Sequence, residues 1–209
     1  MTGGIFCIEN WSGDLRSKDS STDLLEFLER HGAARTVHQR VSTARELGHY
    51  LSRFASQTTY RVGYLAMHGS RGQVFVGSTP VSLETLISWS TLEGEAAPRL
   101  TAGGDPEEYV VDLAGKVLYL GSCASLNVSR DQLAKLRAET GAIAVCGYQR
   151  SVDWFEAAGF ELLLLPALAA ATSGERQSVG AALKRLWKRS GTLMDTLGFI
   201  SEPNYAPTA

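Results

Sequence analysis

The sequence predicts an α/β protein built on a mainly parallel central sheet. Short apolar runs alternate along the chain with segments whose apolar residues recur at helical spacing. This alternation is typical of repeated β-α-β units. A chain of 209 residues, 44% of them hydrophobic, is long enough to bury one sizeable core. We therefore expect a single domain over residues 1–200, followed by a flexible tail over 201–209.

The first half of the chain begins with an apolar strand at 4–8. A helix is predicted over 22–30, where four apolar residues form one stripe and Gly32 follows the last turn. A strand at 34–41 comes next, and then a helix capped by Ser42 with apolar residues at helical spacing. The clearest strand is 61–67, because it is a run of apolar residues that stops at His-Gly. A hairpin strand at 73–76, a turn at 78–80 and a helix at 83–90 complete this half.

The second half opens with a polar, Gly- and Pro-containing stretch, 91–108, which is typical of a mobile loop. Strands are predicted at 116–120 and 142–146, separated by a helix over 129–139 that Gly141 ends. Two further helices are expected over 154–171 and 179–197.

Composition excludes several classes of function. The net charge of −2 gives no cationic field for nucleic acid or anionic lipid, so neither partner is expected. The longest apolar stretch, 162–171, is too short to cross a bilayer. No secretory leader is evident, and the three cysteines include no CxxC pair. We therefore expect a cytoplasmic protein with reduced thiols, no metal site and no organic cofactor.

Two predicted strands end in residues that carry chemistry. The apolar run before His68-Gly69 and the apolar run before Cys123 are far enough apart for one crossover, so their strands can be parallel neighbours. Side chains at the carboxyl ends of such strands meet in one crevice. A thiol becomes a good nucleophile when an imidazole takes its proton, and Gly69 allows a close approach of its backbone amide. These residues predict a thiol nucleophile, Cys123, with His68 as its base.

This order of motifs, an apolar block ending in His-Gly and a later one ending in Ser-Cys, resembles the caspase-like cysteine peptidases, including the bacterial caspase and CHAT proteases. The resemblance spans the chain from the first strand to about Leu165. It implies a three-layer α/β/α sandwich in which His68 is the general base, Cys123 the nucleophile, and the amides of Gly69 and Cys123 an oxyanion hole. Cys123 is not preceded by the Gln-Ala of true caspases, which favours the wider group.

The resemblance also implies where the residue before the cleaved bond is bound. Asp153, in the loop after the strand at 142–146, matches an acidic pocket position that accepts Arg or Lys, and Asp14 is a second candidate. Ser122 is assigned to the same substrate-binding set. Arg150 gives the opposite interpretation, since a basic pocket selects an acidic residue. We expect cleavage after a basic residue.

The partners implied are a protein substrate and an activator or regulatory protein, in a bacterial defence or signalling pathway. A homodimer is compatible with the resemblance. The main alternative is a catalytically idle caspase-like scaffold or interaction module. A nucleotide-binding or receiver-like domain is less favoured because no GxGxxG or Walker loop is present. Another cysteine-dependent hydrolase or amidotransferase is less favoured because no Gly-x-Cys-x-Gly elbow surrounds Cys123.

Overall fold

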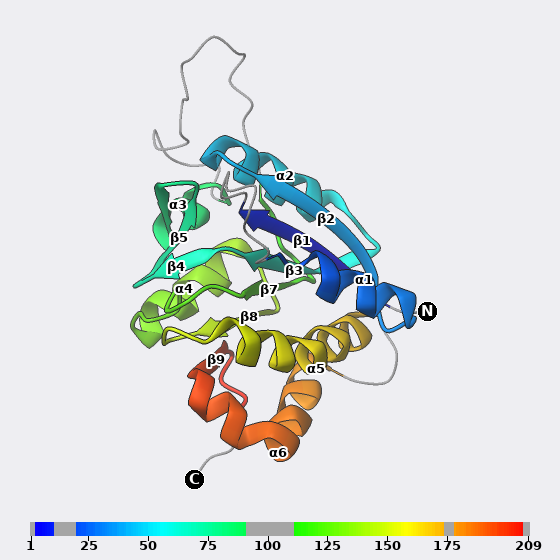
Figure 1. Ribbon diagram of the computed structural model, residues 1–209. Coiled ribbons are helices and arrows are strands. Elements are labelled where there is room, and N and C mark those ends of the chain that lie inside the picture. Colours follow the sequence, from blue (N-terminus) through cyan, green and yellow to red (C-terminus); the bar gives the residue numbers. More distant parts are fainter. Residues whose placement is uncertain (1–2, 11–19, 91–110, 174–177, 207–209) are drawn as a thin grey trace.

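The computed structural model describes residues 3–10, 20–90, 111–173 and 178–206. Its centre is a six-stranded sheet with the strand order β2-β1-β3-β7-β8-β9 (Figure 1). These strands are β1 (Gly4–Asn10), β2 (Arg35–Val41), β3 (Tyr60–Ala66), β7 (Val117–Leu120), β8 (Ala144–Tyr148) and β9 (Phe199–Glu202). All neighbours pair in parallel except β9, which is antiparallel to β8. The predicted α/β class with a mainly parallel sheet is confirmed.

Helices cover both faces of this sheet. One face carries α1 (Thr22–Arg30), α5 (Trp154–Thr172) and α6 (Val179–Leu197), and the other carries α2 (Ala44–Ser56), α3 (Leu83–Ser88) and α4 (Arg130–Thr140). Figure 1 shows α2 above the sheet and α5 and α6 below it. Successive side chains of a strand point to opposite faces, so Cys7 belongs to one core cluster and Phe6 to the other. Burial on both faces explains why the strands are continuous apolar runs.

A small antiparallel sheet follows β3 directly. It consists of β4 (His68–Ser70), β5 (Gln73–Val76) and β6 (Thr79–Ser82). The sequence predicted only the middle strand and placed a turn at 78–80, whereas Thr79 and Pro80 lie in β6. Proline is tolerated there because β6 is an edge strand, with no strand pairing on its outer side. The sheet holds the backbone of His68 in place, since β4 begins at that residue.

The C-terminal end differs from the prediction. Ser201 and Glu202, expected in the flexible tail, belong to β9, and Ser201 is buried and pairs with Cys146. Gly198 ends α6 with a φ of +61° and turns the chain back along β8. A four-residue strand that begins one residue after a helix has too little sequence pattern to be recognised.

Helix α5 has a mean hydropathy of 1.4 over 18 residues, which by length and composition would suffice to cross a membrane. In the structure its inner face is part of the core, with Phe160, Leu164, Leu165 and Leu168 fully buried. Leu162 and Leu163 are on its exposed side. Its apolar character therefore matches that of a core helix packed on the sheet.

Candidate active site

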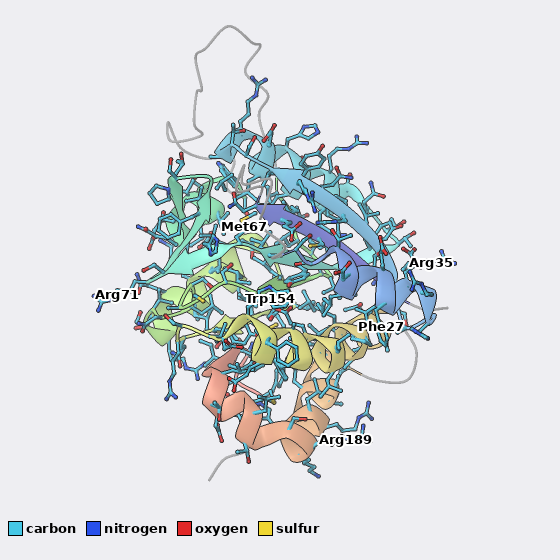
Figure 2. All side chains as sticks on the ribbon, in the orientation of Figure 1. Phe27, Arg35, Met67, Arg71, Trp154 and Arg189 are labelled. Carbon is cyan, nitrogen blue, oxygen red and sulfur yellow. The ribbon has the colours of Figure 1, made fainter. Side chains whose placement is uncertain are left out.

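The structure brings His68 and Cys123 to one cavity. The strands β3 and β7 are parallel neighbours, and the two residues follow their carboxyl ends. The cavity has a volume of about 260 Å³. It is lined by Glu9, Asn10, Ser21, Tyr64, Ala66, Met67, His68, Gly121, Cys123, Val152, Trp154, Ala157 and Glu161. Met67, between β3 and β4, and Trp154, at the start of α5, are labelled in Figure 2.

Gly69 packs tightly against the cysteine loop. A Cβ at this position would lie 2.7 Å from the carbonyl oxygen of Cys123 and 2.8 Å from Ser122 Cβ. Both distances are shorter than van der Waals contact, so only glycine fits between β4 and the loop. The backbones of Gly69 and Cys123 therefore lie close together, at the ends of parallel neighbouring strands.

The loop that carries Cys123 is fixed on both sides. The amide of Gly121 donates to the Leu65 carbonyl at 3.0 Å, and the amide of Ala124 donates to the Arg150 carbonyl at 2.8 Å. Ala124 has a φ of +48°, a left-handed conformation that a non-glycine residue adopts at some energetic cost. Within the described residues, the Cys123 N–H between these two amides has no hydrogen-bond acceptor. It is therefore available to a bound group.

Cys123 differs from the other two cysteines in that it lines the cavity. Its Sγ is half-buried in the cavity wall and accepts a hydrogen bond from the Val152 amide at 3.4 Å. An N–H donor aimed at sulfur stabilises negative charge there. Cys7 and Cys146 are fully buried, and burial raises the pKa of both thiols. Both cysteines are therefore core residues.

His68 is exposed at the first residue of β4 and lines the same cavity. A histidine with only a structural role would normally bond a backbone carbonyl through its ring. No side chain or backbone group in the described part of the chain hydrogen-bonds to this imidazole. Its ring nitrogens are therefore not engaged by the fold.

Two of the predicted substrate-binding residues, Asp153 and Ser122, are not among the residues that line the cavity. Asp153 is the N-cap of α5, and its carboxylate accepts the amides of Phe155 and Glu156 at 2.9 and 3.1 Å. Ser122 is fully buried, with its hydroxyl 3.4 Å from the Leu65 carbonyl. Asp14 lies outside the described residues, as does the predicted loop 91–108.

The alternative of a basic pocket built on Arg150 finds no support in its contacts. The Arg150 guanidinium donates to the Asp195 carbonyl at 3.4 Å, and its aliphatic part packs on Gly198. These contacts direct the side chain toward the end of α6, and Arg150 does not line the cavity.

A buried carboxyl that the sequence reasoning missed lies in the cavity wall. Glu161 of α5 is 6% exposed, and its two oxygens accept the hydroxyls of Tyr64 and Tyr119 at 2.8 and 2.7 Å. Tyr148 Oη lies 2.7 Å from the Tyr119 hydroxyl, which has one proton and donates it to the carboxylate. Burial raises the pKa of Glu161 to about 7, against the lowering effect of these hydrogen bonds.

A second buried carboxylate, Glu9, also lines the cavity, with different partners. It accepts hydrogen bonds from the Ser21 amide at 2.6 Å and the Ser20 hydroxyl at 3.0 Å. His38 Nε2 and Arg40 Nε lie 2.9 and 3.2 Å from its Oε2. Burial alone would raise the pKa of Glu9, but the bonds from His38 and the serines hold it below its ordinary value.

Both carboxylates have a sequence signal of the same kind. Glu9 interrupts the end of an apolar strand, and Glu161 is the one acidic residue in an otherwise apolar stretch of α5. A charge in the middle of an apolar run is seldom buried without a role, because its desolvation is costly. The sequence predicted only a helix over 154–171 and assigned no role to Glu161.

No cluster of three or more His, Cys, Asp and Glu side chains suited to a metal ion occurs among the residues the structure describes. Comparison with known proteins adds no assignment: no family model matches the chain, and no curated protein matches it. The site is therefore interpreted from its own geometry.

Proposed function

We propose that the protein is a cysteine endopeptidase that hydrolyses peptide bonds with a Cys123–His68 dyad. The observation that carries this proposal is the single cavity lined by both side chains, with Gly69 packed against the backbone of Cys123. The order of the strands and the position of the dyad after adjacent parallel strands support the caspase-like assignment made from the motifs.

In the first half of the reaction, His68 takes the thiol proton and Cys123 Sγ forms a bond to the carbonyl carbon of the substrate. Negative charge develops on the carbonyl oxygen, where the unengaged N–H of Cys123 and the amide of Gly69 are the expected donors. The C–N bond then breaks, and His68 gives the proton to the leaving amine. The product of this half is a thioester on Cys123.

In the second half, His68 removes a proton from water as the oxygen attacks the thioester carbon. The S–C bond breaks, the sulfur regains a proton from the imidazolium, and the acid product leaves. No oxidant, reductant or metal is needed for this sequence, because each half only moves one proton and exchanges one bond.

We also propose a substrate class and a form of regulation for this peptidase. The substrate is a protein cleaved after Arg or Lys, and activity is gated by an activator or regulatory protein in a bacterial defence or signalling pathway. A cytoplasmic location, expected from three cysteines without a CxxC pair, is part of the same proposal, and a homodimer is compatible with the resemblance.

The test is covalent labelling of Cys123 by a peptidyl acyloxymethyl ketone, which alkylates an activated thiol with loss of a carboxylate. Intact mass and peptide mapping report the site and the rate. We expect labelling of the native protein, none in Cys123→Ala, and a rate at least a hundredfold lower in His68→Ala. His31→Ala, at the exposed end of α1, is the matched control and should label at the native rate. Equal rates in the native protein and His68→Ala would leave Cys123 an ordinary thiol and favour the idle-scaffold alternative.

A further inference from the structure

Glu161 is a buried carboxylate without a counter-ion. Its two oxygens are held by neutral phenols, and no Lys or Arg in the described ranges contacts it. Glu9, in the same cavity, has both His38 and Arg40 beside it. Burying a lone carboxylate is costly, and either a bound proton or a bound cation relieves that cost.

The carboxylate still has capacity to accept hydrogen bonds. Each carboxylate oxygen has two acceptor positions, and the hydroxyls of Tyr64 and Tyr119 occupy one on each oxygen. One position on each oxygen is left, which matches the paired N–H donors of a guanidinium group. An ammonium group would use the same oxygens as a single point charge.

Gly121 brings this carboxylate close to the nucleophile. A Cβ at position 121 would lie 2.5 Å from Tyr64 Cε2 and 2.9 Å from Glu161 Oε1. The missing side chain therefore lets the Tyr64–Glu161 pair press against the backbone two residues before Cys123. Two residues of chain span at most about 7 Å, a distance suited to the long stem of Arg or Lys.

We infer that Glu161 recognises the positive side chain of the residue before the cleaved bond, accepting a guanidinium or ammonium group at the buried end of the cavity. This inference rests on the proposed peptidase function and assigns its specificity to α5 rather than to Asp153. Arginine is preferred to lysine, because only the guanidinium can use both remaining acceptor positions at once. Tyr64 and Tyr119 are positioning residues that orient the carboxylate.

The experiment compares two peptidyl acyloxymethyl ketones that differ only in the residue next to the warhead, arginine in one and neutral, nearly isosteric citrulline in the other. We expect the native protein to be labelled at Cys123 at least tenfold faster by the arginine probe. In Glu161→Gln this preference should fall to threefold or less. Glu156→Gln removes an exposed carboxylate from the first turn of the same helix and should retain the native preference.

Three other outcomes of this labelling experiment are informative, and each would overturn a different part of the proposal. Equal labelling of the native protein by the two probes, abolished in His68→Ala, would overturn the inference and leave the peptidase proposal standing. Loss of the preference in Asp153→Asn but not in Glu161→Gln would assign recognition to Asp153. If both probes labelled Cys123 at the same rate in the native protein and in His68→Ala, the proposed peptidase function would be contradicted.

A binding measurement keeps the inference testable if Glu161→Gln folds poorly. N-acetyl-arginine amide and N-acetyl-citrulline amide are titrated into Cys123→Ala at pH 8, and the thermal midpoint is followed. A rise in the midpoint with the arginine ligand alone supports a cation site in the cavity. Identical midpoints with both ligands at millimolar concentration would contradict it.

Discussion

Glu9 and Glu161 line the same cavity and are each 6% exposed, yet their pKa values move in opposite directions. Glu9 is surrounded by amide, hydroxyl, imidazole and guanidinium donors, which outweigh its desolvation. Glu161 has two phenols, which do not. The difference has two causes: Glu161 lies deeper among protein atoms, and its hydrogen-bond partners carry no charge. Glu9 is stabilised by charged partners that the fold provides. Glu161 has no charged partner among the described residues and can still accept hydrogen bonds from a ligand.

The largest effect on stability is expected from Glu9→Gln. The substitution leaves His38 and Arg40 without their carboxylate and should lower the free energy of unfolding by about 3 kcal/mol at pH 7. Because the folded pKa of Glu9 lies below its ordinary value of 4.5, its contribution is present above pH 4.5 and is lost as the pH falls through the folded pKa. Urea unfolding at pH 7 measures the loss of stability in Glu9→Gln. The same measurement at pH 3 shows whether that loss has become smaller.

The matched control for this prediction is Glu26→Gln. Glu26 forms an exposed ion pair with Arg30 on α1, and such pairs contribute about 0.5 kcal/mol or less. If Glu9→Gln and Glu26→Gln had the same small effect at pH 7, the cluster around Glu9 would not be the stabilising element described here.

The opposite pH dependence is expected for Glu161. Its folded pKa of about 7 exceeds its ordinary value of 4.5, so the native protein holds a proton that the unfolded chain has released between those values. Stability therefore falls by about 3 kcal/mol as the pH rises from 4.5 to 7. Among the described residues, four other titratable groups lie close enough to interact with this carboxyl. They are Tyr64, Tyr119, Tyr148 and Cys7, and burial raises the pKa of each above this range.

Glu161→Gln should remove this decline. The difference in unfolding free energy between the variant and the native protein should shift in favour of the variant by about 3 kcal/mol between pH 4.5 and 8. Denaturant titrations at several pH values measure this difference directly, and the contributions of all unchanged groups cancel in it. Parallel curves for the two proteins would show that Glu161 ionises as an ordinary carboxyl.

A smaller effect should come from Tyr119→Phe, which removes one of the two phenols on Glu161. A hydrogen bond to a charged acceptor contributes about 1.5 to 3 kcal/mol, and one to a neutral acceptor about 1 kcal/mol. The loss of stability should thus be larger at pH 8, where Glu161 is ionised, than at pH 5. Tyr148→Phe removes a hydroxyl that does not touch the carboxylate, and its effect should be independent of pH over this range. Equal pH dependence in the two variants would contradict the assignment of donors.

The parts of the molecule that the sequence predicted share a regular pattern. The parallel strands are continuous apolar runs and most helices have a clear stripe or cap, so the class of fold followed from periodicity. His68 and Cys123 were found because each ends such a run, and strand ends of a parallel sheet meet at one edge. Elements without a pattern of their own were missed: β9 has four residues, and β4 and β6 pair only with β5.

The lining of the cavity was harder to predict, because it depends on contacts between distant elements. Glu161 meets Tyr64 and Tyr119 only once α5 has packed across β3 and β7. Asp153 illustrates the reverse: its place in the loop suggested a pocket residue, but it also precedes a helix, where an aspartate is a preferred N-cap. Local sequence favoured the cap, and the structure shows that role.

Asp153 therefore provides the smallest predicted effect and the sharpest contrast with Glu161. Asp153→Ala removes the acceptor for two amides at the start of α5 and should lower the free energy of unfolding by about 1 kcal/mol, while Asp153→Asn, which can still cap, should restore most of that loss. If the residue acts only as a cap, neither variant changes the preference for the arginine probe over the citrulline probe. If its charge recognises the substrate, Asp153→Asn keeps the stability and loses the preference. Measuring unfolding and probe preference on the same two variants separates these roles, because the amide retains the hydrogen bonds of the carboxylate but not its charge.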